Sequence, residues 1–130
     1  FRSRAGALES LYRAYKDKAE FFFVYVLEAH PDDGWQVPQN KKDGVIYKKP
    51  DSLSDRAGIA GECIKSLGLT MPCLLDDMEN SALKLYKGWP ARICVVDTSG
   101  KVAYLSPASP QGVNPPEIEK VLKQMTMNTK

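Results

Sequence analysis

Histidine is nearly absent from this chain, and cysteine is scarce. Of its 130 residues one is a histidine, His30, and three are cysteines: Cys63, Cys73 and Cys94. No two cysteines form a Cys-x-x-Cys pair, and their spacing is not that of metal ligands. Since structural zinc sites gather four such ligands, the sequence predicts no metal site. His30 is the one histidine on which a histidine-dependent chemistry could rest.

The chain also lacks a strong excess of one charge and a long apolar run. Its 18 basic and 16 acidic residues leave a net charge of +2, and no basic stretch is interleaved with aromatic residues, so nucleic acid is not an expected partner. A membrane-spanning helix needs about 20 predominantly apolar residues, and no run approaches that length. Residues 1–130 fit a single domain that is long enough to bury a core.

The most apolar stretch of the chain is residues 21–28. Apolar and aromatic residues stand there on consecutive positions, which predicts a strand buried on both faces, as in a parallel sheet covered by helices. The polar segment that follows contains Glu28, His30 and Trp35. Because open α/β sheets place their sites at the carboxyl ends of strands, we expect this segment to carry the chemistry.

Helices and strands alternate along the rest of the chain. A long loop is expected over 31–54, and the two strands closest in sequence are expected to form an antiparallel hairpin. Leu53 and Tyr86 are expected to face inward, and Cys73 and Cys94 to be inert, buried strand residues. The predicted elements are a helix over 1–19, the strand over 21–28, a helix capped by Ser52 or Ser54 and closed by Gly68, a strand over 71–77, a helix over 79–87, strands over 92–97 and 101–106, and a helix from Pro115. This order predicts an α/β domain whose first half pairs in parallel.

Several motifs of this sequence resemble those of the iodothyronine deiodinases. Residues 23–35, with Glu-Ala-His followed by Asp-Gly-Trp, are similar to the family's Tyr-Ile-Glu-Glu-Ala-His-x-x-Asp-Gly-Trp signature. Further similarities cover 52–56, 76–80, 85–92 and 113–117, so the resemblance runs in order along nearly the whole chain. It implies a thioredoxin-like sheet with flanking helices, in which Pro90, before the terminal hairpin, is cis and faces the redox nucleophile.

The resemblance also implies that part of the site precedes Phe1. The family's nucleophile, selenocysteine or cysteine, stands in an Xaa-Pro-Pro-Phe motif at the start of its first helix, and Phe1 would be the last residue of that motif. The first strand of the sheet would then be missing between 21–28 and 92–97. Because unpaired interior strands recruit other strands, we expect either an upstream segment or a second copy of the chain, in a homodimer, to fill the gap. Residues 1–130 alone are expected to be inactive.

The resemblance assigns roles to five residues. His30 would be the proton donor or shuttle, supported by Glu28. Arg92 would bind an anionic substrate group or stabilise a thiolate, while Trp35 and Pro90 would contact the substrate. The implied activity is that of a deiodinase-related oxidoreductase. It would act on a small-molecule substrate, with a thiol reductant as cosubstrate and no other cofactor.

Each role has a simpler alternative in the residues themselves. A histidine at a strand end is often a surface or capping residue, a tryptophan often belongs to the core, and Arg92 could form an ordinary ion pair. Arg92 through Gly100 is also similar to the peroxiredoxins, which leaves a thiol peroxidase open. A noncatalytic thioredoxin-like scaffold is the third interpretation.

One position departs from the family pattern. The family carries a second histidine shortly before its Leu-x-Asp-Arg helix, where this chain has Pro50, or Lys49 if the alignment slips. We therefore expect a substrate smaller or less specifically bound than an iodothyronine.

Overall fold

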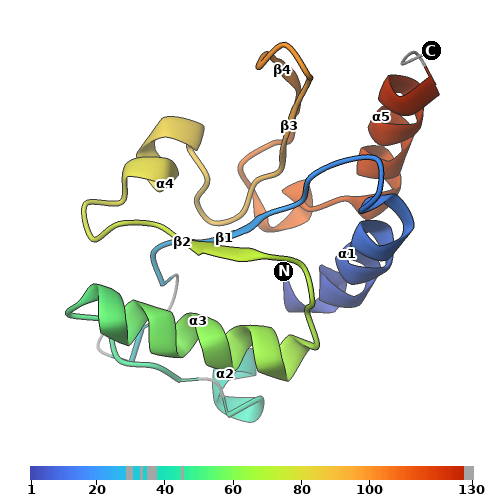
Figure 1. Cartoon of the computed structure of the whole chain (residues 1–130). Helices are drawn as coiled ribbons and strands as arrows, with labels where there is room; N and C mark the ends of the chain where they lie inside the picture. The colour runs from blue at the N-terminus through green and yellow to red at the C-terminus, as the bar shows by residue number, and fades with distance from the viewer. Residues whose placement is uncertain (29–30, 33, 35–37, 45, 128–130) are drawn as a thin grey trace.

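The computed structural model describes residues 1–28, 31–32, 34, 38–44 and 46–127. Its elements follow the predicted order, with one short helix inside the expected long loop (Figure 1). They are α1 (Arg2–Tyr15), β1 (Phe23–Tyr25), α2 (Pro38–Lys42), α3 (Leu53–Leu67), β2 (Cys73–Leu75), α4 (Ser81–Tyr86), β3 (Cys94–Val96), β4 (Val102–Leu105), the 3-10 helix η1 (Pro110–Gly112) and α5 (Pro115–Met127). In the described ranges no helix is long and apolar enough to cross a membrane.

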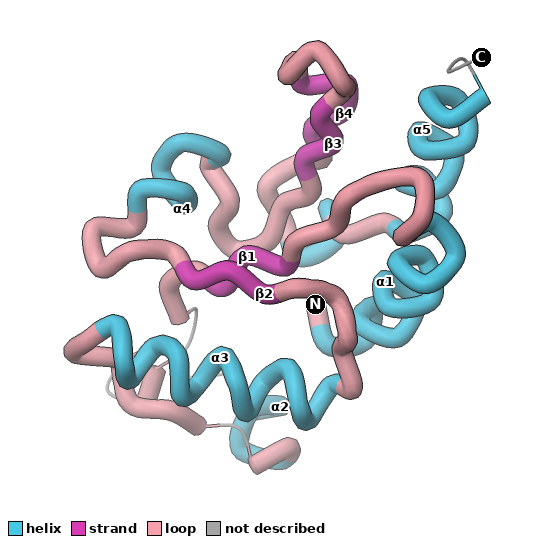
Figure 2. The backbone as a smooth tube through the Cα atoms, viewed as in Figure 1, coloured by secondary structure: helices cyan, strands magenta, loops and turns pink. Residues whose placement is uncertain are grey.

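The four strands form two separate pairs. β1 runs parallel to β2, with Val24 opposite Leu74, and β3 runs antiparallel to β4, with an irregularity between Val95 and Val96. This confirms both the parallel first half and the terminal hairpin. No ladder of the described residues joins β1 to β3, and Figure 2 shows the two strand pairs as distinct segments, the hairpin standing away from β1 and β2.

The prediction that the strand over 21–28 is buried on both faces is wrong. Only three of its residues are in the ladder, and the side chains of Phe22 and Val24 are 53% and 40% exposed. Phe23, in contrast, packs against the core around Ala5 and Met71. The strand therefore alternates between a covered face and an open one, because the described elements cover only one side of it.

Helix α1 connects the two strand pairs through two small cores. Its Leu11 and Tyr15 pack with Ile118 and Leu122 of α5, and residues of the hairpin join this cluster. Nearer its N-terminus, Ala5 packs with residues that flank β2, and Phe23 joins there. Helix α1 thus contributes to both cores, one beside the hairpin and one beside β1 and β2.

Helix α3 begins and ends as predicted. The Ser52 Oγ accepts a hydrogen bond from the backbone N–H of Asp55 at 3.1 Å, which identifies Ser52 as the N-cap. Gly68 closes the helix with a left-handed φ of 63°, a conformation that favours glycine. Leu53 was expected to face inward, but it is 49% exposed. It is the first residue of α3, at the end of the helix.

Candidate functional site

The carboxyl ends of β1 and β2 meet at the N-terminus of α3, as expected for a site in a parallel sheet. Leu27 and Glu28 follow β1, and residues 76–80 follow β2. A cavity of about 410 Å³ opens there. Its lining residues are Leu27, Lys49, Pro50, Asp51, Arg56, Met78 and Asn80. The cavity therefore includes Pro50 and Lys49, one of which stands where the family carries its second histidine.

Asp76 organises the segment after β2. Its carboxylate is buried and accepts hydrogen bonds from the backbone N–H groups of Asp77, Ala82 and Leu83 at 3.0, 2.8 and 2.9 Å. Two of these N–H groups belong to the first turn of α4, where the helix itself supplies no acceptor. Asp76 thereby fixes the start of α4 against the end of β2.

Arg56 of α3 is the most deeply buried charged side chain that the structure describes, with 1% of its surface exposed. Its Nη1 donates to the carbonyl oxygens of Asp76 and Asp77 at 3.0 and 2.5 Å, and its Nη2 donates to the Asn80 Oδ1 at 3.0 Å. These bonds clamp α3 to the segment after β2. No role for Arg56 was predicted from the sequence. Its spacing of four residues from the buried Ala60 places it on the inward face of α3, a signal that could have marked it.

Glu28 lies near Arg56 without bonding to it. One carboxylate oxygen, Oε1, is buried and has no hydrogen-bond partner within the described ranges. Burial raises the pKa of Glu28, and the positive charge of Arg56 only partly opposes this. The expected contact of Glu28 with His30 is not tested, because Ala29 and His30 lie outside the described residues.

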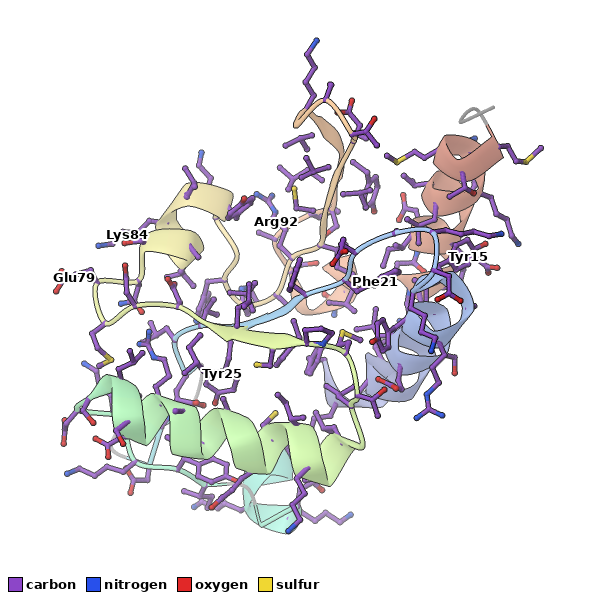
Figure 3. The ribbon with its side chains drawn as sticks, in the orientation of Figure 1. Tyr15, Phe21, Tyr25, Glu79, Lys84 and Arg92 are labelled. Atoms are coloured by element: carbon purple, nitrogen blue, oxygen red, sulfur yellow. The ribbon has the colours of Figure 1, made fainter. Side chains whose placement is uncertain are left out.

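Pro90 and Arg92 stand together ahead of the hairpin. The Trp89–Pro90 peptide bond is cis, as expected. The Arg92 Nη1 donates to the Tyr86 carbonyl at 3.2 Å, while its Nε is buried and has no partner within the described ranges. Figure 3 places Arg92 between α4 and the hairpin. Its bond to the last carbonyl of α4 is a backbone contact, and among the described residues Arg92 forms no salt bridge.

Two further expectations about apolar residues need correction or stay open. Tyr86 was expected to face inward, but it is 46% exposed, because six-residue α4 is held mainly through its backbone by Asp76. Trp35, expected to contact the substrate, lies outside the described residues, so its role stays a prediction.

The three cysteines are poor candidates for a nucleophile. None of them forms a disulfide, and all are half-buried; Cys73 and Cys94 were expected to be buried, but the two-stranded ladders leave one edge of each strand uncovered. Burial raises the pKa of each thiol. Since the thiolate is the reactive form, these thiols are largely protonated and unreactive near neutral pH.

The N-terminus of α1 lies beside β1. The ring of Phe1, the N-cap residue, stacks on the ring of Phe23 with 5.1 Å between centroids. No side chain caps this helix, and its first turn contains no acidic residue. The start of α1 therefore lies next to the strand that leads to Glu28.

Comparisons with known proteins point in one direction. The family profile of iodothyronine deiodinase matches residues 1–126. The type II iodothyronine deiodinase of Fundulus heteroclitus is 36% identical over 112 residues, which are 85% of this chain and 42% of that protein. Those of Sus scrofa and Homo sapiens are 32% and 31% identical over 126 residues, 95% of this chain and 46% of each relative. The chain thus spans about half the length of these curated relatives.

Proposed function

The chain belongs to the iodothyronine deiodinase family, and we propose on that basis that it forms most of the site of a reductive dehalogenase. The nucleophile, a thiolate or selenolate, would be carried upstream of Phe1. The family match over residues 1–126 is the observation that carries this proposal. The substrate would be a small halogenated organic molecule, with a thiol as the reducing cosubstrate and no other cofactor.

The proposed fold is thioredoxin-like, with one strand supplied from upstream. Among the described residues β1 and β3 each pair on one edge only, and a strand between them would join the two pairs into one sheet. The stacking of Phe1 on Phe23 supports this arrangement, because a strand that leads into α1 would arrive beside β1. A nucleophile at that junction would lie at the uncapped N-terminus of α1, where the helix dipole and free N–H groups lower a thiol pKa.

The side chains of this chain would then serve the reaction from both sides of the inserted strand. The nucleophile attacks the halogen, the carbon–halogen bond breaks, and the carbon takes a proton. Two thiol groups of the cosubstrate then reduce the chalcogen–halogen adduct, which forms a disulfide, regenerates the nucleophile and releases halide. His30 would deliver the proton, with Glu28 behind it. Arg92 would attract an anionic group of the substrate with its unpartnered Nε, and Pro90 and Trp35 would border the substrate.

The test is the activity of the chain extended upstream through the nucleophile. We expect this protein to release iodide from a small iodinated phenol in the presence of dithiothreitol, while residues 1–130 alone release none. A matched extended protein with alanine at the nucleophile position is the control. Turnover of hydrogen peroxide without any dehalogenation would favour the peroxidase alternative, and inactivity toward both substrates would favour the noncatalytic scaffold.

A further inference from the structure

A carboxylate oxygen and a guanidinium nitrogen are buried without partners beyond the carboxyl end of β1. Within the described ranges, the Glu28 Oε1 and the Arg56 Nε are both sealed from solvent and form no hydrogen bond. One atom is an acceptor and the other a donor, and the two side chains carry opposite charges. Because neither atom is open to solvent, only groups of the protein itself can reach them.

Arg56 is held beside the segment that leads from β1 to Glu28. Its Nη1 donates to the Asp76 carbonyl at 3.0 Å, and the Asp76 N–H donates to the carbonyl of Tyr25, the last residue of β1, at 2.9 Å. Leu27 and Arg56 also line the same cavity. The guanidinium is thus anchored by bonds in which Glu28 takes no part, and its charge is permanent, because arginine is not deprotonated in proteins.

The charge of Glu28 depends on this guanidinium. Burial favours the neutral carboxyl and raises the pKa of Glu28, while the positive charge of Arg56 opposes that rise. The described hydrogen-bond partners of Arg56 are neutral oxygens, so its charge is left to act on Glu28. Without Arg56, a carboxylate with one buried and unpartnered oxygen would take up a proton at a higher pH.

The other titratable or charged groups around Glu28 are placed differently. They are Cys63 on α3, Asp76 after β2, and Lys49 and Asp51 in the loop before α3. The negative charge of Glu28 raises the pKa of the Cys63 thiol, which stays neutral. The Asp76 carboxylate is bonded to backbone N–H groups of α4, and Asp51 pairs with Lys48. The side chain of Lys49 is exposed, where water and salt screen its charge.

We propose that Arg56 is a positioning residue, whose buried guanidinium holds the Glu28 carboxylate in its charged form behind His30. This rests on the proposed function, in which His30 delivers a proton with Glu28 behind it. A negative charge there favours the protonated imidazole from which the proton leaves. Arg56 therefore acts through Glu28 and does not contact the substrate.

The direct test follows the ¹⁵N–¹H resonance of the Arg56 Nε through a pH titration of residues 1–130. It needs no turnover, so its result stands apart from the proposed dehalogenation. We expect the resonance to move in one transition above the ordinary glutamic acid pKa of 4.5, and this transition to be absent in Glu28→Gln. Asp51→Asn, which removes another carboxylate beside the cavity, should leave it in place. A resonance that does not move, or that moves equally in Glu28→Gln, would overturn the proposal.

The pH profile of iodide release by the extended protein separates positioning from a structural role. Arg56→Gln removes the charge, so Glu28 becomes neutral at a higher pH and the acidic limb of the profile should move to higher pH. Arg56→Lys keeps a positive charge and should move it less, and Lys65→Ala, which removes an exposed cation further along α3, should not move it. A loss in Arg56→Gln by the same factor at every pH would contradict the proposal.

The titration also decides the question if a variant or the reaction fails. If Arg56→Gln does not fold, the Nε resonance of the unaltered protein and of Glu28→Gln gives the answer. No iodide release by the unaltered extended protein would count against the dehalogenase, whereas a missing Glu28 transition in residues 1–130 would count against the role of Arg56.

Discussion

Glu9 is a buried carboxylate that stabilises the fold. It is 7% exposed and accepts hydrogen bonds from the backbone N–H of Thr70 at 2.8 Å, from the Thr70 hydroxyl, and from the Arg13 Nε at 2.9 Å. Burial by itself raises the pKa of Glu9, but the Thr70 and Arg13 bonds outweigh it and lower the pKa to about 2. The charged form of Glu9 thus joins α1 to the segment before β2.

The lowered pKa of Glu9 predicts sensitivity to acid. A carboxyl with a depressed folded-state pKa stabilises the protein above its unfolded pKa, near 4.5, and this contribution is lost as the pH falls toward 2. Glu9→Gln should lower the free energy of unfolding by about 3 kcal/mol at neutral pH, from the size of the shift. The difference from the unaltered protein should vanish near pH 2. Urea unfolding across this pH range measures it.

The control for Glu9 is Glu79→Gln, which removes an exposed carboxylate of the same type. It should leave the free energy of unfolding unchanged across the range. The same pH dependence in Glu9→Gln and in the unaltered protein would show that Glu9 does not stabilise the fold in its charged form.

His30 carries the residue-scale prediction about catalysis. In the active, extended protein, His30→Ala should reduce turnover about a hundredfold, the usual scale of a lost general acid, while the far-ultraviolet circular dichroism stays the same. Asp32→Asn changes an exposed residue of the same segment and serves as the control. Iodide release in steady state is the measurement, and full turnover by His30→Ala would remove His30 from the mechanism.

At the scale of elements, α3 is fixed at both ends and by one buried side chain. Its N-cap, its glycine C-cap and the Arg56 clamp each fix one part of it. The sequence offered both Ser52 and Ser54 as the cap, and the structure selects Ser52, whose backbone is extended with φ −143°. The selection follows from backbone conformation, because an N-cap residue must lie outside the helical region.

The choice between the two serines predicts a measurable difference. Ser52→Ala should lower the free energy of unfolding by about 1 kcal/mol, because the Asp55 N–H loses its acceptor. Ser54→Ala, two residues along and already inside the helix, should cost little or be slightly stabilising, since alanine favours helix. Thermal unfolding of the two variants compares them directly, and equal destabilisation would contradict the assignment of the cap.

The strands show how far the sequence could predict elements. The order, the parallel first pair and the hairpin followed from apolar runs and turn residues, which are local signals. The lengths did not: residues 21–28 became a three-residue ladder with Val24 exposed. Strand length and burial depend on the neighbours on both edges, and in the part of the chain that the structure describes β1 and β3 each pair on one edge only.

At the scale of the whole molecule, the free edges of β1 and β3 predict where an upstream strand would act. The Phe23 N–H and the Tyr25 carbonyl both bond toward β2, so the Val24 N–H points to the free edge. The same alternation holds in the hairpin. The Ile93 carbonyl accepts from the Ser106 N–H and the Ile93 N–H donates to the Ser106 Oγ, so the next N–H, that of Cys94, points away from β4. We expect hydrogen exchange at Val24 and Cys94 to be much slower in the extended protein than in residues 1–130.

The internal reference for that exchange experiment is the N–H of Phe23, which is already bonded to the Pro72 carbonyl at 2.8 Å. Its exchange should change far less than that of Val24. If all three groups slow by the same factor, the upstream segment stabilises the protein globally without inserting between the strands.

The whole site also bears on the choice of substrate. Lys49 and Pro50 line the cavity at the position where the family carries its second histidine, so we expect weak or no iodothyronine turnover by the extended protein. Competing thyroxine against a small iodinated phenol in one assay measures this preference. Tight, saturable thyroxine turnover would show that the replaced histidine is not needed.

The sequence by itself determined the family, the order of elements and the closure of α3 at Gly68, because each of these is written in neighbouring residues or a short motif. The cis Pro90 followed from the resemblance to the family, and the choice of Ser52 over Ser54 followed from the structure. Only the tertiary structure decided which faces of the strands are covered, that Asp76 holds α4, and that buried Arg56 clamps α3 to the segment after β2. The bonds of Arg56 join residues 20 or more positions apart, such as Arg56 and Asp76. Local periodicity shows that such a side chain faces inward, but its partners are set by how the elements pack.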